Sequence, residues 1–117
     1  MTETEIILKP IYFEFDKSNI TQDGAFELDK LVQVMKNNEK MIIMAKSHTD
    51  SRGSDDYNLS LSDRRAKSTV QYVISKGIDA SRISGKGMGE SEPAEVCNPC
   101  TEAQYALNRR SEFLIVK

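Results

Sequence analysis

The chain has 117 residues, of which 38% are hydrophobic and 29% are charged, proportions typical of one soluble globular domain. Its 16 Lys and Arg residues stand against 18 Asp and Glu residues, for a net charge of −2, so it lacks the basic excess expected of a nucleic-acid-binding protein. No apolar run is long enough to cross a membrane, and the polar start MTETEIILKP is not a secretory signal peptide. We therefore expect either a cytosolic protein or a piece of a longer one.

The first half of the chain predicts a strand, a helix and a second strand. Residues 11–15 (IYFEF) alternate aromatic and β-branched residues, which is typical of a strand. Residues 21–38 predict an amphipathic helix capped by Thr21 or Asp23. Its apolar residues recur at the three- and four-residue intervals of one helix face: Phe26, Leu28, Leu31, Val32 and Met35. Residues 41–45 (MIIMA) are continuously apolar, which predicts a central strand buried on both faces.

The second half begins with a longer helix, predicted over residues 57–76. Its apolar residues form one stripe: Leu59, Ala66, Val70, Val73 and Ile74. Gly77 suits the left-handed position that follows a helix end. The glycine-rich segment 82–91 (RISGKGMGES) predicts a strand followed by a turn.

The end of the chain predicts a loop over 92–100, a short helix or turn over 101–110 and a last strand over 111–117. The order is therefore strand, helix, strand, helix, strand, strand. This order predicts an α/β fold, an α+β sandwich in which a mixed four-stranded sheet carries its helices on one face. We expect residues 1–9 to be a linker and residues 10–117 to form one domain.

A charged turn follows the predicted central strand. In HTDSRGSDD, residues 48–56, Asp50 lies at the carboxyl end of that strand, where open α/β sheets most often bind ligands, and Gly53 suits the turn. Arg65 lies about two turns into the next helix, and its side chain leans back toward the helix N-terminus. Asp50 and Arg65 can thus face one crevice. Alternatively, Asp50 shapes the turn and Arg65 forms a surface or intrahelical ion pair.

Four segments carry a resemblance to a known family, in order and over nearly the whole chain from Ile11. They are IYFEFDKSNI (11–20), HTDSRGSDDYNLSLSDRRAKSTVQYVISKGID (48–79), RISGKGMGESEP (82–93) and NRRSEF (108–113). The chain resembles the OmpA-like carboxy-terminal domain, the peptidoglycan-associated module of outer-membrane proteins, lipoproteins and flagellar stator subunits. The resemblance implies a periplasmic domain that binds peptidoglycan non-covalently at meso-diaminopimelate, without catalysis or cofactor. It implies no nucleic-acid partner, and membrane contact only through an upstream segment of the parent protein.

By motif position, the resemblance assigns the main ligand contacts to Asp50, within HTD, and to Arg65, directly before Ala66. The distal carbon of diaminopimelate carries an ammonium and a carboxylate, which an aspartate and a forked guanidinium complement. Lysine would not replace Arg65 well for this purpose. We expect both residues to be exposed ligand groups outside the core. The family commonly has glycine before HTD, where this chain has Ser47.

The resemblance assigns lesser ligand contacts to Phe15, Asp16 and Leu61. For Phe15 and Leu61 the alternative is packing in the core. Backbone N–H groups near Asp16 suit a second ligand carboxylate, but Asp16 can equally serve as a helix or turn cap.

Cys97 and Cys100, in CNPC, lie in the late polar loop. A thioredoxin-like motif would instead follow an early strand and open a helix. We expect a disulfide within the loop, formed in an oxidising compartment. The alternative is a thiol-disulfide enzyme that uses these two residues.

A third functional class is a cell-wall hydrolase that uses Asp50 or Asp56. The sequence shows neither a cluster of metal ligands nor a nucleophile with a base, which disfavours this class. His48 is the only histidine, and we expect it to be structural. In the NRR segment, 108–110, we expect ion pairing at the sheet edge beside Glu112 rather than a basic binding patch.

Overall fold

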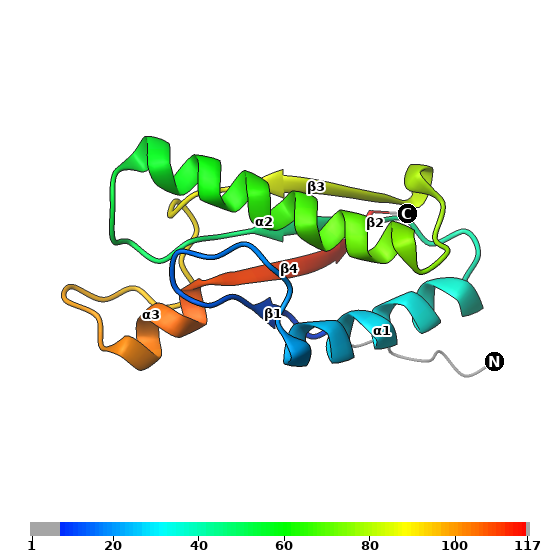
Figure 1. Cartoon of the computed structure of the whole chain (residues 1–117), viewed down its shortest axis with the longest axis horizontal. Helices are drawn as coiled ribbons and strands as arrows, with labels where there is room; N and C mark the ends of the chain where they lie inside the picture. Colours follow the sequence, from blue (N-terminus) through cyan, green and yellow to red (C-terminus); the bar gives the residue numbers. More distant parts are fainter. Residues whose placement is uncertain (1–7, 117) are drawn as a thin grey trace.

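The computed structural model describes residues 8–116. Residues 1–7 of the expected linker lie outside this range, and the division of the chain before residue 10 stays a prediction. The elements in chain order are β1 (Ile11–Tyr12), α1 (Gln22–Asn37), β2 (Ile43–Ser47), α2 (Asp55–Ser75), the 3-10 turn η1 (Ala80–Arg82), β3 (Ile83–Gly87), α3 (Glu102–Asn108) and β4 (Arg110–Ile115) (Figure 1). The predicted order is confirmed, with bounds shifted by a few residues.

The four strands form one mixed sheet in the order β1-β4-β2-β3. Strands β2 and β3 are parallel, whereas β4 runs antiparallel to both β1 and β2. Parallel neighbours need a long crossover, and α2 supplies it between β2 and β3 (Figure 1). The predicted mixed sheet with an interior second strand is therefore confirmed.

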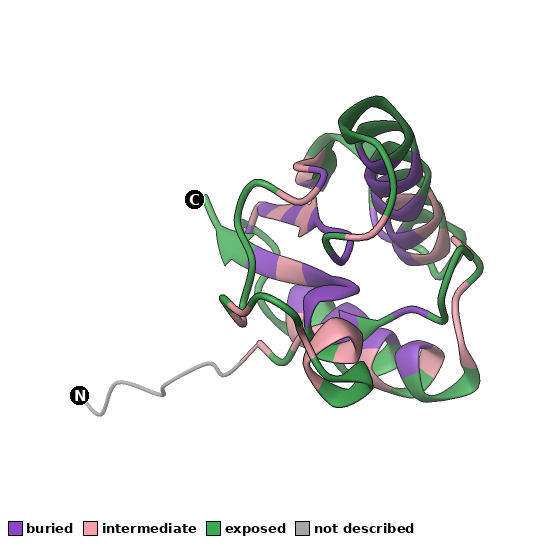
Figure 2. Cartoon of the chain, turned by 90° about the vertical axis from the view of Figure 1, so that its left-hand side faces the viewer, coloured by how far each residue is buried: buried purple, intermediate pink, exposed green. Residues whose placement is uncertain are grey.

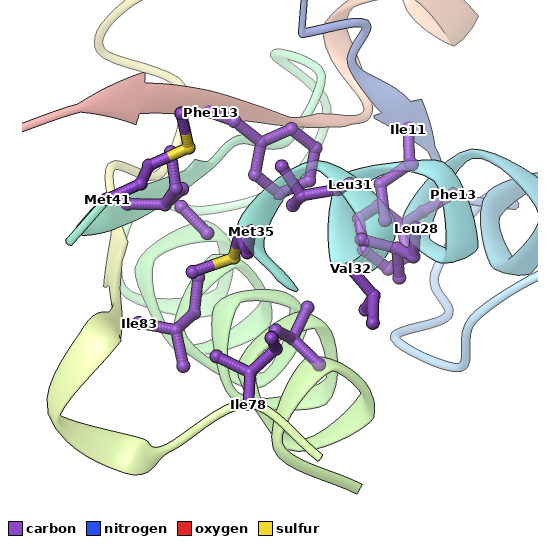
Figure 3. Close-up of a cluster of buried hydrophobic side chains, with 13 residues drawn as sticks. Ile11, Phe13, Leu28, Leu31, Val32, Met35, Met41, Ile78, Ile83 and Phe113 are labelled. Carbon is purple, nitrogen blue, oxygen red and sulfur yellow. The ribbon is translucent and has the colours of Figure 1, made fainter. Parts of the chain in front are cut away.

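Helices α1 and α2 lie on the same face of the sheet, and the core lies between them and the strands (Figures 1 and 2). Figure 3 shows Phe113 of β4 and Leu31 of α1 within this core. The side chains of β2 alternate between buried and half-buried, so the prediction of burial on both faces is wrong. Lys46 points away from the helices and pairs with Glu92 at 2.7 Å, because the sheet has a helical layer on one side.

Helix α1 is capped by Thr21, one of the two predicted caps, whose hydroxyl accepts a hydrogen bond from the Gly24 N–H at 3.0 Å. Four of the five predicted stripe residues are buried: Leu28, Leu31, Val32 and Met35. Phe26 is 63% exposed. It lies two residues before the buried Leu28, and so about 200° away from Leu28 around the helix. Its ring lies 4.4 Å from the Lys30 ammonium. Among residues 8–116, no helix is both long enough and apolar enough to span a bilayer.

Helix α2 buries a face that the apolar pattern predicted only in part. Leu59 and Ile74 of the predicted stripe are exposed. The buried side of α2 also carries polar residues: Asn58, Ser62, Arg65 and Thr69. Ala66 and Val73 of the predicted stripe are buried, and Val70 packs against the core. The polar groups break the apolar period, so the sequence pattern predicted only part of the inner face. Gly77 has a φ of +102° after the helix end, as predicted.

Buried hydroxyl groups join β2, β4 and α2. The hydroxyl of Ser47 hydrogen-bonds that of Ser111, which lies 3.1 Å from the hydroxyl of Thr69. The Thr69 hydroxyl in turn lies 2.8 Å from the Arg65 carbonyl. Since the carbonyl can only accept, Thr69 donates to it, Ser111 donates to Thr69 and Ser47 donates to Ser111. Ser47 is therefore satisfied at the position where the resembled family commonly has glycine.

Strand β1 ends at Tyr12, earlier than the predicted end at residue 15. The chain turns because the Lys17 N–H donates to the Glu14 carbonyl at 3.2 Å, and Asp16 has a φ of +61°. The left-handed Asp16 keeps the chain from continuing as an extended strand beyond residue 15. The resulting turn over residues 14–17 lies against the inner side of α2.

Candidate functional site

A cavity of about 360 Å³ lies at the carboxyl end of β2. Its wall comes from the 14–17 turn, the loop between β2 and α2, the first half of α2 and the residue before β4. All five predicted ligand residues line it: Phe15, Asp16, Asp50, Leu61 and Arg65. The fold thus brings together residues from three separate sequence segments at the predicted edge of the sheet.

Asp50 is 4% exposed, and its carboxylate accepts four hydrogen bonds. Oδ1 accepts from the backbone N–H and Nε of Arg52 at 3.0 and 3.3 Å, and Oδ2 accepts from Arg52 Nη2 at 2.7 Å and Arg109 Nη1 at 3.5 Å. Burial raises the pKa of Asp50, but the hydrogen bonds from Arg52 outweigh burial and hold that pKa below its ordinary value. Asp50 is therefore an anion at neutral pH.

Arg65 is 0% exposed, and its guanidinium binds three backbone carbonyls. Nε donates to Lys17 at 2.8 Å, Nη1 to His48 at 3.0 Å and Nη2 to Glu14 at 3.0 Å. Burial, followed by the nearby Arg109, lowers the pKa of Arg65 to about 10, so the group stays charged at neutral pH. These three bonds leave one N–H on each terminal nitrogen without a carbonyl partner.

The expectation that Asp50 and Arg65 are exposed is therefore wrong. A buried charge must be paired or hydrogen-bonded: Asp50 is held by two arginines, and Arg65 is held by backbone carbonyls. The alternative roles expected for these two residues are confirmed for Asp50 and wrong for Arg65. Asp50 does shape the turn, because it accepts a hydrogen bond from the Arg52 backbone N–H, but the hydrogen bonds of Arg65 go to carbonyls instead of an acidic partner.

The three lesser candidates have different environments. Phe15 is 54% exposed, so the core alternative is wrong for this residue. Leu61 is buried in the cavity wall. Asp16 is exposed in its turn, and the cap of α1 is Thr21, so the helix-cap alternative for Asp16 is wrong.

Arg52 and Arg109 also line the cavity, and the sequence analysis assigned neither to the site. The Arg52 guanidinium carbon lies 4.3 Å from the centre of the Phe15 ring and 4.0 Å from that of Tyr105. Arg109 donates from Nε to the Phe13 carbonyl at 3.0 Å. Arg52 lies within the charged turn over residues 48–56, so its position in the sequence could have identified it as a site residue. Arg109 is 59 positions from Asp50, and nothing local links the two.

The second arginine of NRR, Arg110, behaves as predicted. Its Nη2 lies 3.2 Å from Glu112 Oε1 and donates to the Glu92 carbonyl at 2.8 Å. The expectation of ion pairing therefore holds for Arg110. It also holds for Arg109, which pairs with Glu102 at 3.2 Å and, in the cavity, with Asp50 at 3.5 Å.

Cys97 and Cys100 form a disulfide in the loop between β3 and α3, as predicted. Neither cysteine lines the cavity beside Asp50, and neither does Asp56. Because Asp50 is ionised, it has no proton to donate as a general acid.

His48 is 1% exposed and lies beside the site, since its backbone carbonyl is one of the three that bind Arg65. Its Nε2 lies 3.2 Å from Glu112 Oε1, but without hydrogen-bond geometry. Burial and then Arg110 lower the pKa of His48 to about 4, despite opposing contributions from Glu112 and Glu92. The ring is neutral at neutral pH, in keeping with a structural role.

This pKa predicts a pH-dependent stability. The unfolded chain takes up a proton on His48 as the pH falls through about 6.5, whereas the folded chain does not until about 4. The contribution of His48 is therefore present above 6.5 and is lost as the pH falls. We expect the free energy of unfolding to drop by about 1 kcal/mol between about pH 7 and pH 5.5. Urea denaturation of the parent and of His48→Gln checks this, and equal pH dependence in both would contradict it.

A model of the OmpA family matches residues 12–106 of the chain. Outer membrane protein A of Bordetella avium is 40% identical over 105 residues, which make up 90% of this chain and 53% of that protein. The chain therefore spans about half the length of this relative.

Two solved structures show the same fold. The peptidoglycan-associated lipoprotein from Burkholderia pseudomallei matches with a TM-score of 0.84 and 26% identity, over 90% of this chain and 87% of that one. The C-terminal domain of Helicobacter pylori MotB matches with a TM-score of 0.83 and 18% identity, over 93% of this chain and 84% of that one. Since the family model covers most of the chain and a close relative aligns along it, the chain belongs to the OmpA family.

Proposed function

We propose that this chain binds peptidoglycan non-covalently, at the meso-diaminopimelate of the stem peptide, and so anchors an outer-membrane protein or lipoprotein to the cell wall from the periplasm. The observation that carries the proposal is the cavity in which an ionised Asp50 lies near Arg65 and Arg109. Family membership and the likeness to a peptidoglycan-associated lipoprotein support peptidoglycan as the ligand.

The chemistry of the cavity suits the distal end of diaminopimelate. Its ammonium binds Asp50, and its carboxylate binds the N–H groups of Arg65 that the backbone carbonyls leave free. Each such charge-assisted bond contributes about 1.5–3 kcal/mol. Phe15 and Leu61 provide apolar walls for the methylene chain, and the backbone at Asp16 receives a second carboxylate.

The binding is non-catalytic. Asp50 is held ionised by hydrogen bonds from Arg52 and by Arg109, so it has no proton to give to a leaving group. Cys97 and Cys100 are joined in a disulfide away from this cavity. Many stems in one wall polymer add avidity, so single-site affinity need not be high.

Asp50→Asn tests the proposal on purified sacculi. The change keeps the shape of the side chain and removes its charge, so we expect at least a tenfold loss of retention, since a bond to a charged group contributes about 1.5–3 kcal/mol. Asp56→Asn is the matched control, because Asp56 is exposed and does not line the cavity. Thermal melts establish that both variants are folded.

A competition experiment with the parent chain tests the proposal even if Asp50→Asn does not fold. A free tripeptide that ends in meso-diaminopimelate should release the parent chain from sacculi. Soluble wall fragments should not accumulate, because an anchor does not cleave its ligand. Full retention of folded Asp50→Asn, or no release by the tripeptide, would count against the proposed site.

A further inference from the structure

We propose that Arg52 is an internal competitor for the ligand: its guanidinium occupies Asp50 and must leave before a ligand ammonium can bind there. Arg52 thereby sets the affinity of the site. This inference rests on the function proposed above and adds a residue to which that proposal gives no role.

The hydrogen bonds at Asp50 require this displacement. A carboxylate offers about four lone-pair positions, and four donors already occupy them on Asp50. Three of these donors belong to Arg52: its backbone N–H, Nε and Nη2. An ammonium that approaches Asp50 must therefore replace an existing donor.

Arg52 is the donor that can move. Its side chain is 34% exposed, whereas that of Arg109 is 9% exposed and is also tied to the Phe13 carbonyl. The Arg109 bond to Asp50 is long, at 3.5 Å, so its removal would free little of the carboxylate. If the Arg52 side chain leaves, its backbone N–H can keep its bond to Oδ1, and the turn stays intact.

The surroundings give the displaced guanidinium a place to go. Nη1 of Arg52 already lies 3.4 Å from Glu102 Oε2, at the start of α3. The other oxygen, Oε1, accepts from Arg109 at 3.2 Å, so Oε2 is the one that Arg52 can take. The rings of Phe15 and Tyr105 flank the guanidinium at 4.3 and 4.0 Å. A shift toward Glu102 keeps Arg52 paired with a carboxylate and next to an aromatic face, so the movement needs no unfolding of the turn.

The test is calorimetric titration of the Arg52→Gln variant with a tripeptide that ends in meso-diaminopimelate. Glutamine cannot form the charged fork on Asp50, so we expect binding about fivefold tighter than in the parent, as for loss of a partly exposed ion pair. Arg64→Gln is the matched control, since it makes the same charge change at an exposed neighbouring position outside the cavity. We expect its affinity to equal that of the parent.

The outcomes separate this inference from the proposed function. If Arg52→Gln binds as tightly as the parent or more weakly, while Asp50→Asn loses binding, Arg52 is not a competitor and the proposed function stands. Tighter binding by Arg52→Gln, with no change in Arg64→Gln, supports the competitor. If neither the parent nor Arg52→Gln binds the tripeptide, both proposals fall.

Discussion

Replacing Arg65 by alanine is expected to lower the free energy of unfolding by about 3–5 kcal/mol. The change leaves the carbonyls of Glu14, Lys17 and His48 without their donor and opens a hole where a fully buried side chain stood. The Phe13 ring also loses the guanidinium that lies 5.1 Å from its centre. Urea denaturation, with midpoint and slope both determined, measures the effect.

Arg64→Ala is the control for this experiment, because Arg64 is the exposed neighbour on the same helix. A surface substitution of this kind changes stability by less than about 0.5 kcal/mol. If Arg65→Ala were as stable as Arg64→Ala, the three carbonyl contacts would not stabilise the fold. Since Arg65 holds the 14–17 turn, lost ligand binding in Arg65→Ala would not by itself establish a contact. The site is better probed through Asp50 and through changes in the ligand.

Much of the fold was predictable because its signals are local. Thr21 caps α1, Gly77 follows α2 with a positive φ, and the order of strands and helices along the chain follows from the change between strand and helix periods. The errors occur where an inner face is polar or an outer face is apolar. Phe26 and Leu59 are exposed, and a period count cannot reveal that a helix buries hydrogen-bonded polar groups.

The candidate site was predictable as a set of positions, and its internal contacts were not. Motif resemblance selected Asp50 and Arg65, and both line one cavity. Their burial depends on partners far away in sequence: the carbonyls of the 14–17 turn for Arg65 and Arg109 for Asp50. Such partners become visible only when the chain is folded, because no local pattern encodes them.

The second large effect is expected on the affinity for the ligand, when the distal carboxylate is absent. A lysine-type stem keeps the ammonium for Asp50 but lacks the distal carboxylate. Arg65 is buried and already bound to three carbonyls, and in the proposed complex its remaining N–H groups bind the distal carboxylate of diaminopimelate. We expect diaminopimelate-containing fragments to bind more tightly by about 2 kcal/mol, or roughly thirtyfold, from one charge-assisted contact. Amidation of the distal carboxylate should weaken binding by a similar factor.

Calorimetric titration of the parent chain with two matched tripeptides, one ending in meso-diaminopimelate and one in lysine, is the most direct test of the central claim. The two ligands differ only in the distal carboxylate, so the protein needs no substitution and its stability does not change. A preference of roughly thirtyfold for diaminopimelate would agree with a carboxylate bound by Arg65. Equal affinities for the two peptides would contradict it, even if the chain still bound sacculi.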